Sequence, residues 1–161
     1  MNSFLTISLT IFRSYKTLGE KAMAQVAEDK LFFQFNTESN SIATIVKHVS
    51  GNMLSRWTDF LITDGEKEWR KRDAEFINDL KTRAELMQTW DKGWACMFNT
   101  IENLKEEDLE RVVFIRKEAH SVAEAINRQL AHYAYHVGQI VFVAKMIADQ
   151  NWTSLSIPRA K

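Results

Sequence analysis

Apolar positions recur every three to four residues in four long stretches of the chain. These stretches span roughly residues 4–27, 42–61, 82–104 and 121–148. A period close to 3.6 residues places such side chains on one face of an α-helix. The sequence therefore predicts four helices, each with an apolar face that needs a partner.

Polar residues with helix-capping ability mark the starts of two of these stretches. Asn40 and Ser41 precede the second, and their short side chains can accept a bond from a free backbone N–H. Ser121 and Glu124 form a capping box at the start of the fourth. Pro158 excludes further helix close to it.

The segments between the helical stretches differ in character. Asp64 and Gly65 form a turn signal at the start of a charged, aperiodic run, which predicts a loop over residues 62–77. A loop of this length is often functional. The sequence RVVFI at residues 111–115 is ambiguous and fits a short extended piece.

Composition supports long helices over a sheet with many turns. The 161 residues include only 5 Gly and 1 Pro, and 45% are hydrophobic. This length fits one domain with a sizeable core. We therefore predict an all-α protein, a four-helix bundle with a long loop between its second and third helices, as a single domain over residues 1–161.

Charge and cysteine content exclude several classes of partner and point to a compartment. Lys+Arg and Asp+Glu balance at 21 each, so no net charge favours binding to nucleic acid or to an anionic membrane. The apolar N-terminus lacks the features of a signal peptide, and no apolar run is long enough to span a membrane. Cys96 is the only cysteine, which excludes an internal disulfide and fits a cytoplasmic protein.

Two histidines interrupt the most apolar stretch of the chain, AHYAYHVGQIVFVAK. His132 and His136 are four residues apart, so on a helix their imidazoles lie one turn apart on the same face. This spacing can offer two ligands to one metal ion, and a third should come from a facing helix. His48, among apolar neighbours in the second helix, is a better candidate than His120.

Imidazole ligands suit zinc, nickel, copper or iron, and a set of three leaves a position for water or substrate. The alternative is that the histidines are structural, hydrogen-bonded core residues. Tyr133 and Tyr135 fall on other faces of the same helix and are interpreted as packing residues. The same interpretation holds for Cys96.

The segment HYAYHVGQI resembles the H-x-x-x-H-x-G-Q-I signature of the DinB/YfiT-like superfamily, whose members are described as metalloenzymes. NSIATIVKH resembles the superfamily's other signature, which ends in a lone metal-binding histidine. SGNMLSRWTDFLITDGEKEWRKRDAEF and NRQLAHYAYHVGQIVFVAK resemble one branch, small bacterial proteins known as a domain of unknown function. The resemblance covers nearly the whole chain.

This resemblance implies a four-helix fold, a homodimer, and His48, His132 and His136 as metal ligands. It also implies a divalent transition metal, with nickel or zinc favoured. Better-understood relatives use the metal to activate a low-molecular-weight thiol. The chain departs from the pattern at Ala74 and Ala160, where the resemblance predicts Gly.

Several polar residues are candidates for a pocket beside the histidines. Asn52, Ser55 or Arg56, and Asp59 continue the stripe of His48 along the second helix, although a solvated helix face would look the same. Gln139 follows His136 by three residues, within reach of a bound water or ligand. Gly138 would let a neighbouring helix approach.

The charged loop offers a further set of candidates. Its side chains could close over the site or contact an anionic substrate, or could simply be solvated. The residues concerned are Arg70, Lys71, Arg72, Asp73 and Glu75.

Three functions remain open at the level of sequence. The first is a metal-dependent enzyme that activates a thiol or water for transfer to a small molecule. The second is a non-catalytic metal-binding protein, and the third is a helical interaction module. The sequence contains no nucleophile triad, phosphate loop or dinucleotide fingerprint.

Overall fold

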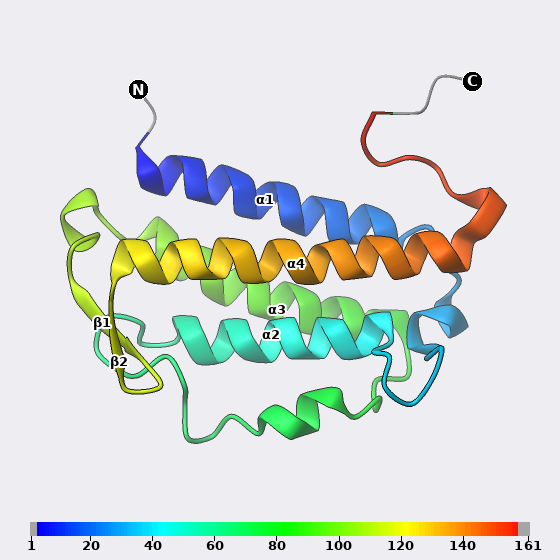
Figure 1. Ribbon diagram of the computed structural model, residues 1–161, viewed down its shortest axis with the longest axis horizontal. Helices are drawn as coiled ribbons and strands as arrows, with labels where there is room; N and C mark the ends of the chain where they lie inside the picture. Colours follow the sequence, from blue (N-terminus) through cyan, green and yellow to red (C-terminus); the bar gives the residue numbers. More distant parts are fainter. Residues whose placement is uncertain (1–2, 158–161) are drawn as a thin grey trace.

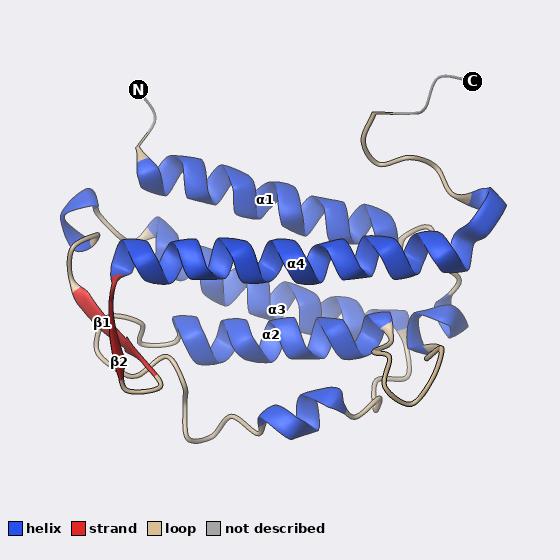
Figure 2. Ribbon diagram, viewed as in Figure 1, coloured by secondary structure: helices blue, strands red, loops and turns tan. Residues whose placement is uncertain are grey.

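Four long helices dominate the computed structural model, which describes residues 3–157 (Figures 1 and 2). They are α1 (Phe4–Met23), α2 (Ile42–Trp57), α3 (Arg83–Glu102) and α4 (Val122–Ala148). This confirms the predicted all-α class and the four-helix bundle. Pro158 and Ala160, singled out in the sequence, lie outside the described residues.

Each long helix begins at a serine or threonine whose side chain accepts a backbone N–H from the first turn. The N-caps are Ser3, Ser41, Thr82 and Ser121. Full capping boxes stand at the starts of α3 and α4, and the second is the box predicted from the sequence. Caps of this kind satisfy orphan donors and define where a helix starts.

The helices pack most extensively in two pairs, α2 with α3 and α1 with α4. Gly93 lets α3 approach α2 closely, because a Cβ there would lie 2.8 Å from the Cα of Ser50. Gly19 makes room in the same way for the ring of Trp90. The bundle is therefore two helix pairs that meet along a shared apolar interior.

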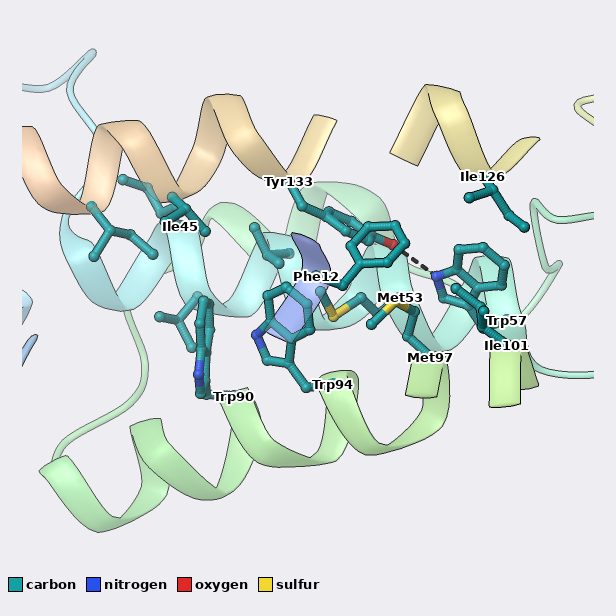
Figure 3. Close-up of a cluster of buried hydrophobic side chains, with 14 of the residues drawn as sticks. Phe12, Ile45, Met53, Trp57, Trp90, Trp94, Met97, Ile101, Ile126 and Tyr133 are labelled. Atoms are coloured by element: carbon teal, nitrogen blue, oxygen red, sulfur yellow. Dashed lines mark hydrogen bonds between the residues drawn. The ribbon is translucent and has the colours of Figure 1, made fainter. Parts of the chain in front are cut away.

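Aromatic side chains fill the centre of that interior (Figure 3). Phe12 of α1, Trp94 of α3 and Tyr133 of α4 all contact one another, and the ring centroid of Phe12 lies 6.5 Å from that of Trp94 and 5.8 Å from that of Tyr133. The indole Nε1 of Trp57 donates to the hydroxyl of Tyr133 at 3.0 Å. Tyr133 is fully buried, as its interpretation as a packing residue requires, whereas Tyr135 is 57% exposed.

Helix α2 ends at Trp57, four residues earlier than predicted. Thr58 is extended, and Asp59 has a positive φ of 49°, which a helix cannot contain. The chain then runs as a long connection to α3 that includes the short 3-10 helix η2 (Arg72–Phe76). The predicted loop over 62–77 therefore holds one helical turn, which lies alongside α2 (Figure 1).

The ambiguous RVVFI segment is one strand of a β-hairpin, and its partner strand was not predicted. Within the described residues the sheet has two strands, β1 (Val112–Ile115) and β2 (Glu118–Ser121), paired antiparallel. The hairpin turn places Arg116 and Lys117 at φ 54° and 66°. Asp64 accepts both of their backbone N–H groups, at 2.9 and 2.7 Å.

Further 3-10 helices lie in the other connections: η1 (Glu28–Phe32), η3 (Glu106–Asp108) and η4 (Asp149–Asn151). From residue 3 to residue 157, none of the helices combines the length and apolar character that crossing a membrane needs.

The structure revises or refines what the sequence suggested for Gly138, Cys96 and Ala74. Gly138 is exposed, and among the described residues nothing would lie within 4 Å of a Cβ there, so no helix approaches it. Cys96 is only partly buried, and its sulfur lies 3.7 Å from the hydroxyl of Thr58. Ala74 is accommodated in η2 without a positive φ.

Candidate functional site

Three histidines from two helices converge at the interface of α2 and α4. One ring nitrogen from each of His48, His132 and His136 lies within 4.8 Å of the others. The Nε2 atoms of His132 and His136 are 3.1 Å apart, the direct result of their four-residue spacing on α4. Two nitrogens each about 2.0–2.1 Å from a zinc ion lie roughly 3 Å apart, so this spacing suits a shared ion.

Each of the three imidazoles bonds through its Nδ1 atom to a side-chain oxygen. His48 bonds to Oε2 of Glu75 at 2.9 Å, His132 to Oε1 of Gln129 at 3.3 Å, and His136 to Oε1 of Gln139 at 2.9 Å. A carboxylate or amide oxygen only accepts, so Nδ1 carries the proton in each ring. The Nε2 atoms are left as the acceptors that a metal ion needs.

The surroundings favour the neutral form of the two histidines on α4. Burial, with the proximity of His136 and His48, lowers the pKa of His132 to about 3. Burial and the nearby His48 lower the pKa of His136 to about 4. Neutral imidazole is the form that coordinates a metal. Two neutral Nε2 acceptors at 3.1 Å also repel each other unless a cation or a proton lies between them.

Glu75 orients His48 and is itself held by Arg70. The Nε and Nη2 atoms of Arg70 donate to the two carboxylate oxygens at 2.7 and 2.9 Å. Burial alone would raise the pKa of Glu75, but the hydrogen bonds from His48 and Arg70 lower it below its usual value. Glu75 is therefore an ionised acceptor, the arrangement that fixes the tautomer of a metal-binding histidine.

Gly51 leaves space for the Glu75 side chain that bonds to His48. A Cβ at this position would lie 2.2 Å from Oε1 of Glu75. Lys47, on the same helix, holds the surrounding backbone by donating to the carbonyls of Ala74 and Ile77 at 3.0 and 2.7 Å. The loop over residues 62–77 thus packs against α2 and brings Glu75 to the site.

Beside the histidines lies a cavity of about 320 Å³ between α2, α4, the loop and the hairpin turn. His48 and His132 form part of its wall, together with the amides of Asn52 and Gln129. Asn52 Oδ1 accepts from the hydroxyl of Tyr133 at 3.1 Å, which connects the cavity wall to the aromatic core. The rest of the lining is cationic: Arg56, Arg70, Arg72, Arg116 and Arg128.

The predicted pocket residues separate into three groups. Asn52, Arg56 and Arg72 line the cavity. Gln139 does not line it but accepts from His136, so its contact is to a proposed ligand. Asp59 and Asp73 are exposed and do not line the cavity; for Asp59 the reason is the early end of α2.

The sequence named Glu75 only as one of several charged loop residues, not as the partner of His48, and it did not single out Gln129, Arg116 or Arg128. The spacing of Gln129 and Gln139, each three residues from a histidine on α4, was a usable signal. No local signal marks Glu75 or Arg116, because a loop and a turn bring them in from distant parts of the chain.

Fold and site together define a class: a four-helix bundle in which α2 and α4 carry a buried three-histidine cluster beside an arginine-lined cavity. Over residues 1–161 the chain matches the model of the family described as protein of unknown function (DUF1572), and it belongs to that family. No curated protein and no solved structure matches the chain.

Proposed function

We propose that the chain binds a divalent transition metal through His48, His132 and His136, with nickel or zinc favoured. The observation that carries the proposal is the common orientation of the three rings. All three Nδ1 atoms have an oxygen acceptor, and a ring nitrogen of each faces the other two. Hydrogen-bonded Nδ1 with free Nε2 is the usual state of histidine ligands.

The resemblance to the DinB/YfiT-like superfamily supports the same three ligands, since its two signatures contain these positions. We extend the proposal to a metal-dependent enzyme acting on a small molecule. A zinc or nickel ion lowers the pKa of a thiol or water that it binds, which supplies a nucleophile at neutral pH.

The chain's own residues support an active rather than a purely structural site. Three protein ligands leave a four-coordinate ion one position for an exchangeable group, whereas structural zinc sites are closed by four. His48 and His132 also line the 320 Å³ cavity, so a small molecule can reach them. Glu75, Gln129 and Gln139 hold the rings in place before any substrate enters.

Metal content tests the binding step. A preparation never exposed to a metal-affinity resin should contain close to one equivalent of transition metal per chain. His132→Ala should remove most of it, because two imidazoles hold a divalent ion far more weakly than three. His120→Ala is the matched control and should keep the metal. Equal metal content in the triple His48, His132 and His136 alanine variant would place the ion elsewhere.

Turnover tests the catalytic step. The metal-loaded protein should be screened with electrophiles in combination with several low-molecular-weight thiols, and with water alone. Activity that disappears in His48→Ala supports metal-dependent transfer. Activity that survives this variant contradicts it. No turnover with any pair, together with metal that has no exchangeable water, would identify a non-catalytic metal-binding protein.

A further inference from the structure

Arg56 is the most unusual charged residue of the cavity wall. It lies in the last turn of α2 and is 3% exposed. Its Nε and Nη1 atoms are fully buried and have no hydrogen-bond partner among the described residues. A buried guanidinium in this condition is strongly unfavourable unless an anion or several acceptors meet it.

The neighbouring acids do not supply the missing partner. Glu66 and Asp64 are close enough to attract Arg56 electrostatically. Glu66, however, already accepts from Arg70 at 3.3 Å and from Arg116 at 3.2 Å. Asp64 accepts the backbone N–H groups of Glu66 and of the hairpin turn. Both carboxylates are thus committed to other groups.

The chain is built to keep the guanidinium in this place. A Cβ on Gly65 would lie 2.2 Å from Nη1 and 3.1 Å from Cδ of Arg56, so the arginine side chain packs directly against this glycine. Ser55 fixes this segment by donating to the carbonyl of Gly65 at 3.0 Å and accepting from the N–H of Lys67 at 3.0 Å. The unpaired guanidinium therefore lies against a backbone segment that is held by two hydrogen bonds.

Two further cations face the same cavity without a carboxylate partner in the described part of the chain. Arg72 and Arg128 are exposed at its rim and form no ion pair there, whereas Arg70 and Arg116 are paired with Glu66 or Glu75. The cavity thus combines one buried cation with two exposed ones. This is the arrangement that binds an oxyanion by charge-assisted hydrogen bonds.

We propose that the cavity is an oxyanion-binding subsite in which Arg56 holds a carboxylate or phosphate group of a small molecule beside the three histidines. Arg72 and Arg128 contact the same ligand from the rim. The inference rests on the proposed function in one respect, that the anionic molecule is the substrate of the metal site. Binding of the anion does not depend on the metal.

The test uses two opposite effects of one substitution. In the ligand-free protein, Arg56→Met removes an uncompensated buried charge and should raise the melting temperature. The same variant should bind inorganic phosphate or succinate at least about tenfold more weakly than the original chain, the loss expected from one charge-assisted hydrogen bond. Affinities should be measured calorimetrically on metal-free protein at constant ionic strength.

Controls separate the subsite from general charge effects. Arg111→Gln removes an exposed arginine that bonds to Asp108 and should leave both affinities unchanged. Arg56→Lys keeps the charge without the planar fork and should give an intermediate affinity, which covers the case in which Arg56→Met does not fold. A preference for phosphate over succinate, or the reverse, identifies the oxyanion.

Two results would overturn the inference. One is a lower melting temperature in ligand-free Arg56→Met with undiminished anion affinity, which assigns Arg56 to structure alone. The other is the absence of phosphate and succinate binding by the original chain. Metal content, measured separately, distinguishes failure of this inference from failure of the proposed function. Arg56→Met should lose anion binding and keep the metal, whereas a chain without metal contradicts the proposed function.

Discussion

Oε2 of Glu75 lies 2.9 Å from Nδ1 of His48, although the two residues come from a loop and a helix with no common sequence motif. The contact fixes which nitrogen of His48 faces the other histidines. It also makes the loop part of the proposed metal site, because the loop carries Glu75. Arg70, from the same loop, donates to both oxygens of this carboxylate.

Replacing Glu75 by Gln should weaken metal binding by about 10- to 100-fold, the usual effect of removing a partner that orients a ligand. The amide lacks the charge that favours the required tautomer and leaves Arg70 with only its longer ion pair to Glu66. Competition with a chromophoric chelator measures the affinity. Glu68→Gln, an exposed change in the same loop, is the control. Equal affinities for the two variants would show that Glu75 does not orient His48.

The glycines Gly51 and Gly138 should respond in opposite directions to substitution by alanine. Both lie inside helices, where alanine normally stabilises by about 0.5–1 kcal/mol. Gly138→Ala should show this gain, because a Cβ there meets open space. Gly51→Ala should instead destabilise by about 1–3 kcal/mol, because its Cβ would overlap Glu75. Chemical unfolding of the two metal-free variants measures both signs, and a stabilised Gly51→Ala would contradict the close contact.

Metal-free protein should lose stability as the pH falls from about 6.5 to 5. The pKa values of His132 and His136 are about 3 and 4 in the folded chain, against roughly 6.5 when unfolded. The unfolded state therefore takes up more protons in this window, so stability is complete above pH 6.5 and declines below it. Melting temperatures across the window give the slope, which should be shallower in His132→Asn. An identical slope in that variant would count against a buried neutral His132.

We propose that two chains associate through an apolar stripe on α4. Tyr135, Phe142 and Met146 are 57%, 64% and 50% exposed, and steps of seven and four residues keep them on one side of the helix. Light scattering at micromolar concentration should give twice the 18.7 kDa mass of one chain. Phe142→Glu should reduce it to a single chain, while Ile62→Glu, on an exposed loop, should not. A monomeric original chain would contradict the proposal.

The bundle and the histidine cluster could be predicted because they depend on local spacing. Helical periodicity gave the four helices, and a four-residue step brought His132 and His136 together. His48 could be added because it interrupts an apolar run in a helix that had to face α4. These features follow from the geometry of one helix or of two neighbouring helices.

The hairpin and the loop contacts could not be predicted because distant residues stabilise them. A tight hairpin usually carries Asn or Gly at its turn, and here Arg116 and Lys117 take those positions. Asp64, some fifty residues earlier, makes their backbone conformation favourable by accepting both N–H groups. The segment after α2 is likewise held by a distant contact, since Ser55 in the last turn of α2 bonds to the backbone of Gly65 and Lys67.

The position of the histidine cluster across the seam of the two helix pairs has a mechanical consequence. His48 belongs to the α2–α3 pair and the other two belong to the α1–α4 pair, with more than eighty positions of chain between His48 and His132. If the proposed metal ion binds there, it closes a very long loop of chain, and cross-links that close long loops restrict the unfolded chain most. It would also link the α2–α3 pair directly to the α1–α4 pair. Removing the ion should therefore quicken amide exchange along the α2–α4 seam more than inside either pair.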